Sequence, residues 1–278
     1  MMTLTRKISG PAAALMALAL AGCASAPRER PAAPEINPQV LLLGEVHDNA
    51  QGQRERFEDL KRRVEAGWRP AIAMEQFDRE NQDLLNRAQR DCADPDCVIR
   101  VMDGPHWDWD LYRPVIDLAL SYQLPLIAAN LSRADASRTV RDGVKATFDA
   151  ASVAAYGLEA ALPADIRAAQ QQEIVAGHCN MLPDSMVGGM VEAQIARDIW
   201  MAKLIRAQAP RPVVLLAGNG HTRKDIGVAR WLNLQAPALT VVSVGYLEHA
   251  APAGAYDRTH IVAAHARPDP CASLKTKP

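Results

Sequence analysis

The stretch LLLGEVHDN, residues 41–49, decides the fold class. Its three leucines belong to the run QVLLLG (39–44), in which polar and apolar residues do not alternate. Such a run predicts a β-strand that is covered on both faces, as in a parallel sheet. The run stops at Gly44, and Glu45 and His47 follow at once. We therefore expect polar side chains at the point where this strand leaves the core.

Further apolar runs of the same kind recur along the chain. They are PAIAMEQF (70–77), LPLIAAN (124–130), RPVVLLAGNG (211–220), ALTVVSVGY (238–246) and, as an edge strand, HIVAAHA (260–266). Amphipathic stretches with a helical period separate these runs. The main ones are 50–66, 78–90 and 183–209. Alternation of strands and helices predicts an α/β fold with a mostly parallel central sheet flanked by helices.

The middle of the chain departs from this alternation. Residues 131–182 are rich in alanine, and the next convincing strand does not begin until residue 212. We therefore expect a helical insertion or cap on the sheet, within a largely helical part at 131–210.

The N-terminus has the pattern of a bacterial signal peptide. Two basic residues precede the short apolar segment ISGPAAALMALALAGC (8–23), which is too short for a membrane span. The segment ends in LAGC, which resembles the lipobox, so we expect removal of residues 1–22 and lipidation of Cys23. Ala24, where an aspartate would favour the inner membrane, points to the outer membrane, facing the periplasm. The alternative is an ordinary secretory signal that ends in cysteine.

The remaining segments are assigned by composition. Residues 23–38 are rich in proline and alanine and predict a flexible tether. One α/β domain at 39–266 and a C-terminal tail at 267–278 follow. The formal net charge of the chain is -1 and aromatic residues make up 5%. A basic surface with base-stacking aromatics is therefore not expected, and neither is a nucleic-acid partner.

Cysteine usage suits an exported protein, because disulfides persist in an oxidising compartment. Cys92 and Cys97 flank the turn-like sequence ADPD, which predicts a local disulfide. Metal ligation is the alternative for this pair, but its spacing matches no zinc pattern. Cys179 and Cys271 could pair or stay free.

Chemically versatile residues follow the ends of several predicted strands. Glu45 and His47 follow the first strand, and Glu75 lies near the end of the second. His221 follows the fourth strand, and Tyr246 ends the fifth. Ligands of open parallel sheets bind beyond the carboxyl ends of the strands, so we expect these side chains to converge on one cleft.

Several roles are open to the polar residues of this cleft. Glu45, His47 and His221 are of the types that bind a divalent transition metal, with Glu75 as a further oxygen ligand. Glu45 and His47 could instead form an acid–base pair. For Glu75 the alternative is a structural ion pair with an arginine, because a buried carboxylate is costly unless it is paired.

A second group of interest lies in AGHCNMLPDSM (176–186), just before a predicted helix. His178 is expected at the cleft, and the alternative is an ordinary turn histidine. Met181, Met186 and Met190 would line an apolar wall or pack in the core.

Together these motifs resemble the ChaN family of haem-binding lipoproteins, within the Tiki superfamily. The resemblance spans about Val40 to Tyr246 and rests on LLLGEVHDN, AIAMEQFDRENQ, LPLIAANLSR, HCNMLP, MVEAQIARDIWMA and LLAGNGHTRKDIGV. It implies a membrane-anchored protein of iron acquisition that binds haem between two subunits. The chain has no Cys-x-x-Cys-His sequence, so the haem would be held without a covalent bond.

Haem requires an apolar slot, an axial ligand and cations for its propionates. Tyr246 is the first candidate for the axial ligand, with Tyr112 and Tyr156 as alternatives. Arg223 and Lys224, just after His221, would meet the propionates.

The same superfamily implies a second function. Tiki proteases and erythromycin esterases resemble hydrolases that use paired Gly-x-x-His motifs and an acidic residue. Carried over to this chain, the resemblance implies a metal-dependent ester or peptide hydrolase. Glu45 or Glu75 would then activate a metal-bound water, and His47 and His221 would be ligands. A third hypothesis is a partner-binding lipoprotein in which these residues are only structural.

Overall fold

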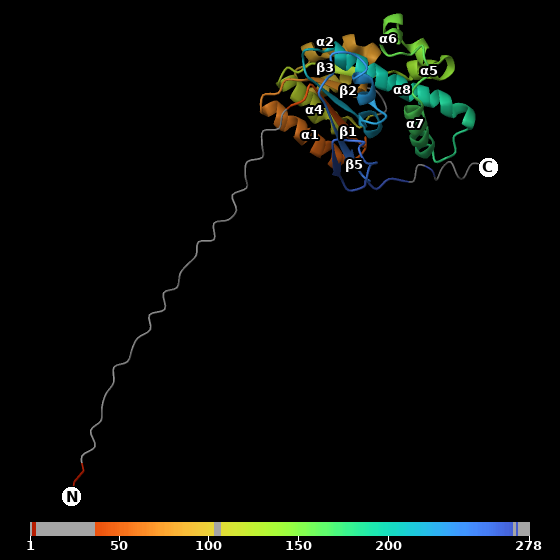
Figure 1. Ribbon diagram of the computed structural model, residues 1–278. Helices are drawn as coiled ribbons and strands as arrows, with labels where there is room; N and C mark the ends of the chain where they lie inside the picture. The colour runs from red at the N-terminus through yellow and green to blue at the C-terminus, as the bar shows by residue number, and fades with distance from the viewer. Residues whose placement is uncertain (1, 4–36, 103–106, 269–270, 272–278) are drawn as a thin grey trace. The chain divides into compact units, whose positions relative to one another are not determined.

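The structure, a computed structural model, describes residues 2–3, 37–102, 107–268 and 271 (Figure 1). The predicted signal peptide, the lipidation site Cys23 and nearly all of the predicted tether lie outside the described residues. From Asn37 onward the chain forms one compact unit. In the part that is described, no helix is both long and apolar enough to cross a membrane.

A six-stranded sheet forms the centre of this unit, in the order β3-β2-β4-β1-β5-β6. Every neighbouring pair of strands is parallel. The strands are β1 (Val40–Glu45), β2 (Ala71–Asp78), β3 (Leu126–Asn130), β4 (Val213–Gly218), β5 (Val241–Leu247) and β6 (Arg258–Ile261). The predicted fold class is confirmed. Strand β6 begins and ends earlier than the predicted run 260–266, and Arg267 beyond it pairs with Asp48 and Glu248.

Helices fill the connections. They are α1 (Ala50–Glu65), η1 (Arg79–Asn81), α2 (Gln82–Asp91), α3 (Pro95–Met102), α4 (Trp109–Ser121), α5 (Arg133–Asp142), η2 (Val144–Thr147), α6 (Ala150–Ala155), α7 (Ala164–Gly177), α8 (Asp184–Ala207), α9 (Asn219–Thr222) and α10 (Val228–Leu232). Asn49 caps α1 by accepting a hydrogen bond from the amide of Gly52 (2.9 Å). Between β3 and β4 the described secondary structure is entirely helical, as the predicted helical insertion requires.

Both faces of the sheet are covered, which explains the continuous apolar runs. In β1, Leu41 and Leu43 pack toward α1, α2 and α4. Val40 and Leu42 pack on the other face, against α8 and α10. Figure 1 shows α1 and α4 on one side of the strands and α8 on the other. Each buried leucine stabilises the fold by about 1.5–3 kcal/mol, so neither face of this strand tolerates a polar residue.

Strand β3 lies at one edge of the sheet, and two glutamines of α2 cover its backbone. Gln82 accepts a hydrogen bond from the amide of Ala128 (2.7 Å) and donates one to the carbonyl of Leu126 (3.1 Å). Gln89 accepts from the amide of Leu126 (3.1 Å) and donates to the carbonyl of Leu124. The two glutamines are seven residues apart and therefore share one face of the helix.

The described residues contain two disulfides, one between cysteines close in the sequence and one between cysteines far apart. Cys92 and Cys97, the predicted pair, are joined between the end of α2 and the first turn of α3. Cys179, in the turn between α7 and α8, is joined to Cys271 of the C-terminal tail.

Candidate functional site

Glu45, at the carboxyl end of β1, is the centre of a buried hydrogen-bond network. Its carboxylate accepts from the hydroxyl of Tyr112 (2.7 Å), from the amide of Gln76 (3.1 Å) and from the guanidinium of Arg56. Nδ1 of His47 lies 2.8 Å from the same carboxylate. Burial by itself would raise the pKa of Glu45, but the charge of Arg56 and these hydrogen bonds outweigh it and lower the pKa. Glu45 is therefore an ionised, fixed partner that orients His47.

His47 is the reachable member of this network. About 46% of its side chain is exposed, and its ring packs edge-on against Trp107 with 5.0 Å between the ring centroids. Burial opposes protonation of His47, but the hydrogen bond to Glu45 and the charge of Glu75 outweigh it and raise the pKa. Because the Glu45 carboxylate accepts the hydrogen on Nδ1, Nε2 of the neutral ring is left to act as a base.

A second network surrounds His221 in α9. Its Nδ1 lies 2.6 Å from Oδ1 of Asp198, and its Nε2 lies 3.4 Å from Oε1 of Glu75. Glu75 also accepts a hydrogen bond from the amide of Gly218 (2.7 Å). All three titrating side chains are buried or nearly so. The arrangement places one imidazole between two carboxylates.

The protonation states follow from this geometry. Burial disfavours a charged His221, but the charges of Glu75 and Asp198 outweigh it and raise its pKa to about 10. Burial also opposes ionisation of Glu75, yet the charge of His221 lowers its pKa to about 2. For Asp198 burial dominates and raises the pKa to about 6. At neutral pH the cluster therefore holds an imidazolium clamped by two carboxylates.

The two networks meet at Gly218. A Cβ atom at Gly218 would lie 3.2 Å from Nε2 of His47 and 3.6 Å from Oε2 of Glu75. Glu45, His47, Glu75 and His221 thus lie together near the carboxyl ends of β1, β2 and β4. Gly218 lets His47 approach the second network closely.

The donor atoms of this cluster do not fit a metal ion. Among the residues that the structure describes, no three or more His, Cys, Asp or Glu side chains are arranged to hold one. Glu45 faces the guanidinium of Arg56, and both ring nitrogens of His221 face carboxylates. The predicted ligand set of His47, His221 and Glu45 is therefore not assembled, because its members are engaged by charged neighbours.

A groove of about 490 Å³ lies between α5, α7 and α8, and we call it the helical groove. Its lining is Arg133, Ala136, Ser137, Val140, Arg141, Ile174, His178, Met190, Ala193, Gln194 and Arg197. Nε2 of Gln194 lies 3.1 Å from Nε2 of His221, so the groove borders the buried network. The groove therefore adjoins the carboxyl edge of the sheet.

His178 enters this groove from the end of α7. Its Nδ1 lies 2.7 Å from the carbonyl oxygen of Ile174. A carbonyl can only accept, so Nδ1 carries the hydrogen and Nε2 has a free lone pair. Met190 lines the groove as well. Met181 and Met186, in contrast, are half exposed at 49% and 48% rather than packed in the core.

Other predicted haem contacts lie elsewhere. Tyr246 is 1% exposed, and its ring stacks on His260 in the layer next to α1. Arg223 pairs with Glu173 (2.6 Å) and with Asp225 (2.6 Å). The structure therefore does not bring Tyr246 or Arg223 into the groove.

The remaining three candidates are likewise engaged away from the groove. Lys224 pairs with Asp257. Among the alternatives to Tyr246, Tyr112 is bound to Glu45 and Tyr156 is buried in a core cluster.

Two groups of contributors were missed from the sequence. Asp198 and Gln194 stand in the middle of α8, where the sequence offers no signal beyond two polar residues within a helix. The groove arginines are Arg133, Arg141 and Arg197. No spacing in the sequence distinguishes them from other exposed arginines.

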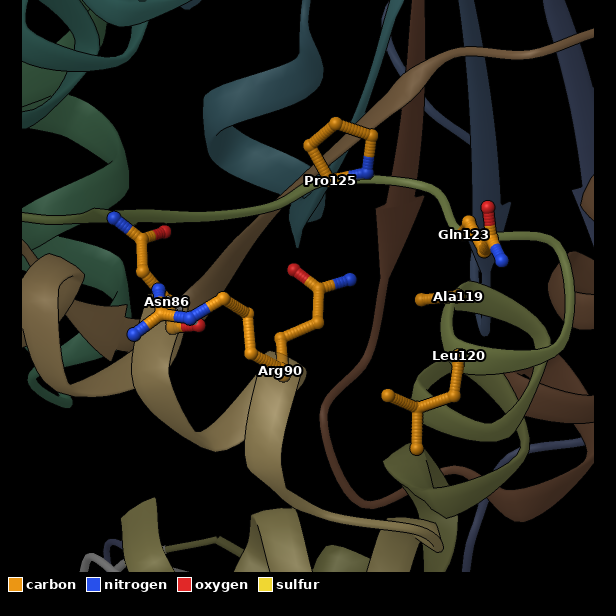
Figure 2. Close-up of a pocket in the computed structure, with 7 residues that line it drawn as sticks. Asn86, Arg90, Ala119, Leu120, Gln123 and Pro125 are labelled. Atoms are coloured by element: carbon orange, nitrogen blue, oxygen red, sulfur yellow. Dashed lines mark hydrogen bonds between the residues drawn. The ribbon is translucent and has the colours of Figure 1, made fainter.

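Another cavity, of about 390 Å³, lies at the amino end of β3. The histidine networks, in contrast, lie at the carboxyl ends of the strands. Figure 2 shows Asn86 and Arg90 of α2 on one side of it and Ala119 and Leu120 of α4 on the other. Pro125, just before β3, closes it at the amino end of the strand. It is therefore remote from the histidine networks.

Comparison with known proteins agrees with this architecture. Over 79% of this chain and 86% of the other, the fold matches the solved structure of Campylobacter jejuni ChaN with cofacial haem binding, at a TM-score of 0.64 and 20% identity. An erythromycin esterase mutant in its open conformation matches at a TM-score of 0.45 and 16% identity, over 75% of this chain and 70% of that one. A comparison with curated proteins gave no match. The first likeness shows the fold, and the second is too distant to bear on function.

The family model described as haem-binding uptake, Tiki superfamily, ChaN matches residues 36–232. This range includes both histidine networks and the helical groove. The chain belongs to the ChaN family of the Tiki superfamily, a family defined by haem binding and uptake.

Proposed function

We propose that this protein binds haem non-covalently in the helical groove and holds it in the cell envelope for iron or haem acquisition. The observation that carries the proposal is His178. Its Nδ1–H is held by the carbonyl of Ile174 (2.7 Å), which aims the lone pair of Nε2 away from the helix. A second hydrogen bond of this kind commonly fixes the tautomer of iron-ligating histidines.

The lining of the groove supports the same ligand. Val140, Ile174, Met190 and Ala193 supply apolar contacts for a porphyrin face. Arginines 133, 141 and 197 supply cations at the same groove, and a guanidinium binds a carboxylate such as a propionate well. The groove thus combines an apolar slot, a free imidazole nitrogen and positive charge.

We further propose that two copies associate around the haem. Val140, Met181 and Met186 are between 40% and 49% exposed. They lie on α5, in the α7–α8 turn and in the first turn of α8. Exposed apolar side chains beside a binding groove are typical of a surface that a partner covers. Haem binding to Campylobacter jejuni ChaN is cofacial, which is in keeping with this arrangement.

Anchoring is proposed from the sequence. The lipobox LAGC would give Cys23 a lipid anchor, and residues 24–38 would separate the domain from the membrane. With Ala24 after the cysteine, we propose attachment to the outer membrane, facing the periplasm.

Titration of the purified protein with haemin tests the groove. We expect a Soret band distinct from that of free haemin, saturating at a defined stoichiometry. In H178A the apparent Kd should rise by at least about tenfold and the band should shift, because the axial ligand is lost. The matched control is H249A, an exposed histidine in the loop after β5. Equal spectra for both variants would refute His178 as the ligand.

One observation favours a second candidate function, hydrolysis of an ester or peptide. His47 is half exposed and oriented by the ionised Glu45, and the imidazolium of His221 lies nearby. That geometry suits a general base, because the ionised Glu45 orients the ring of His47 and stabilises its protonated form. A panel of ester and peptide substrates tests it, with H47N as the variant. A loss of about 10²–10⁴ in rate is expected if His47 is the base.

A further inference from the structure

The C-terminal tail is held to the loop that follows β1 by an ion pair between Arg267 and Asp48. The guanidinium of Arg267 donates to both carboxylate oxygens of Asp48 (2.8 and 2.9 Å). It also donates to both oxygens of Glu248 (2.8 Å each). Asp48 directly follows His47 in the chain. The tail is thus held beside the carboxyl edge of the sheet.

Four residues further on, the tail is fastened a second time. Cys271 forms a disulfide with Cys179, the residue after His178, and the two Cα atoms are 5.6 Å apart. The disulfide closes a loop across 92 residues, whereas Cys92–Cys97 closes only five.

The turn beside His178 has an unusual backbone. Cys179 (φ 63°) and Asn180 (φ 56°) both have the left-handed conformation. Asparagine adopts it readily, but cysteine does so rarely. Local support comes from the amide of Asn180, which donates to the carbonyl of Val175 (2.9 Å). The Cys179–Cys271 disulfide joins this turn to the C-terminal tail and is its covalent link to a distant part of the chain.

We propose that the Cys179–Cys271 disulfide is a redox-controlled fastening of the helical groove, and that its reduction frees the His178 turn and weakens haem binding. The proposal rests on the haem groove proposed above. In the step itself the S–S bond breaks and two thiols form. A dithiol reductant supplies two electrons and two protons and becomes a disulfide. Thiol–disulfide exchange with an oxidised disulfide takes up the two electrons and two protons and re-forms the Cys179–Cys271 bond.

Haemin titration of the full chain tests this proposal with paired variants. C179S/C271S removes the fastening and keeps His178, and C92S/C97S removes the other disulfide as the matched control. We expect C179S/C271S, and the wild type reduced with a dithiol and desalted without oxygen, to bind haemin about tenfold more weakly than the oxidised wild type. That factor corresponds to about one molecule in ten retaining the competent turn. Oxidised C92S/C97S should bind as the wild type does.

Amide hydrogen exchange without haem separates the two proposals. Exchange at residues 178–181 should be faster in C179S/C271S than in the oxidised wild type. If oxidised wild type and C179S/C271S bind haemin equally, redox control of the groove is overturned, although haem binding itself stands. If the oxidised wild type does not bind haemin, the proposed function fails, and redox control of haem binding fails with it. Exchange then still shows whether the disulfide holds the turn.

Discussion

Nδ1 of His221 lies 2.6 Å from Oδ1 of Asp198, a hydrogen bond that joins the turn after β4 to the middle of α8. On the other side of the ring, Glu75 places an oxygen 3.4 Å from Nε2. One imidazolium therefore offsets two buried carboxylates that would otherwise repel each other. This bond also connects the sheet edge to the helix that lines the groove, because Gln194 of the same helix contacts His221.

The raised pKa of His221 predicts a specific dependence of stability on pH. The folded protein keeps this proton up to about pH 10, whereas the unfolded chain loses it near the ordinary histidine pKa of 6.5. The stabilisation is therefore complete below about pH 6.5 and is lost as the pH rises toward 10. Within that window the free energy of unfolding should fall by up to about 1.4 kcal/mol per pH unit. Urea denaturation between pH 6 and 9.5 measures the slope, and H221Q should flatten it.

Removing Arg56 alone should lower the free energy of unfolding more than removing Arg56 together with the charge of Glu45. R56M leaves an ionised carboxylate buried without its cation and should destabilise the fold by about 3 kcal/mol. E45Q/R56M removes both charges and should be less destabilised than R56M alone. Chemical denaturation of R56M, of the second single variant E45Q and of E45Q/R56M gives the comparison. A double variant as unstable as the sum of both single variants would contradict coupling between the two side chains.

Replacing Gly44 by alanine should destabilise the fold through a steric clash of the new Cβ atom rather than through backbone strain. A Cβ atom at this position would lie 2.2 Å from Oδ1 of Asn219 and 2.5 Å from Oγ1 of Thr222. We expect G44A to destabilise the protein by about 1–3 kcal/mol, since the side chains of Asn219 and Thr222 must leave their present positions. G220A is the matched control, because a Cβ there meets nothing within 4 Å. Thermal or urea unfolding of both variants measures the difference.

The groove arginines predict a charge effect on haem affinity. R133E should raise the Kd for haemin by at least about fivefold, because it replaces a partner of the propionates by a like charge. R133K should restore most of the binding. R211E, which changes an exposed arginine outside the groove, controls for overall charge. An equal effect of R133E and R211E on the Soret titration would argue against a local contact.

The lipobox predicts where the protein is found. C23A should release the protein into the soluble fraction of the envelope, because the acylated residue is lost. A24D should move the protein toward the inner membrane. Membrane fractionation with immunodetection distinguishes these outcomes from an ordinary secreted protein, which neither change would relocate.

The parallel sheet was predictable because burial on both faces leaves a direct trace in the sequence. Leu41, Leu42 and Leu43 are all fully buried, so the strand shows no alternation. The convergence of His47, Glu75 and His221 followed from the same logic. Residues that end parallel strands meet at one edge however far apart they are in the chain.

What escaped prediction depends on side-chain direction and on packing between distant helices. Tyr246 ends its strand as expected, but it points to the face covered by α1, together with Val244. Arg223 forms an ion pair with Glu173, which lies fifty residues earlier in the chain. Asp198 reaches His221 because α8 packs on the face of the sheet formed by β1 and β4, and His221 follows β4. A helical period in the sequence cannot reveal which neighbour a helix will meet.

The glutamines that cover β3 have a consequence for how copies of this protein can meet. Their side-chain amides bind the backbone groups that a neighbouring strand would otherwise bind. The amide and carbonyl of Leu126 and the amide of Ala128 are therefore already hydrogen-bonded. An incoming chain cannot extend the sheet there without first displacing α2. Two copies therefore cannot associate by pairing their β3 strands. This leaves the surface with the exposed methionines near the helical groove available for self-association.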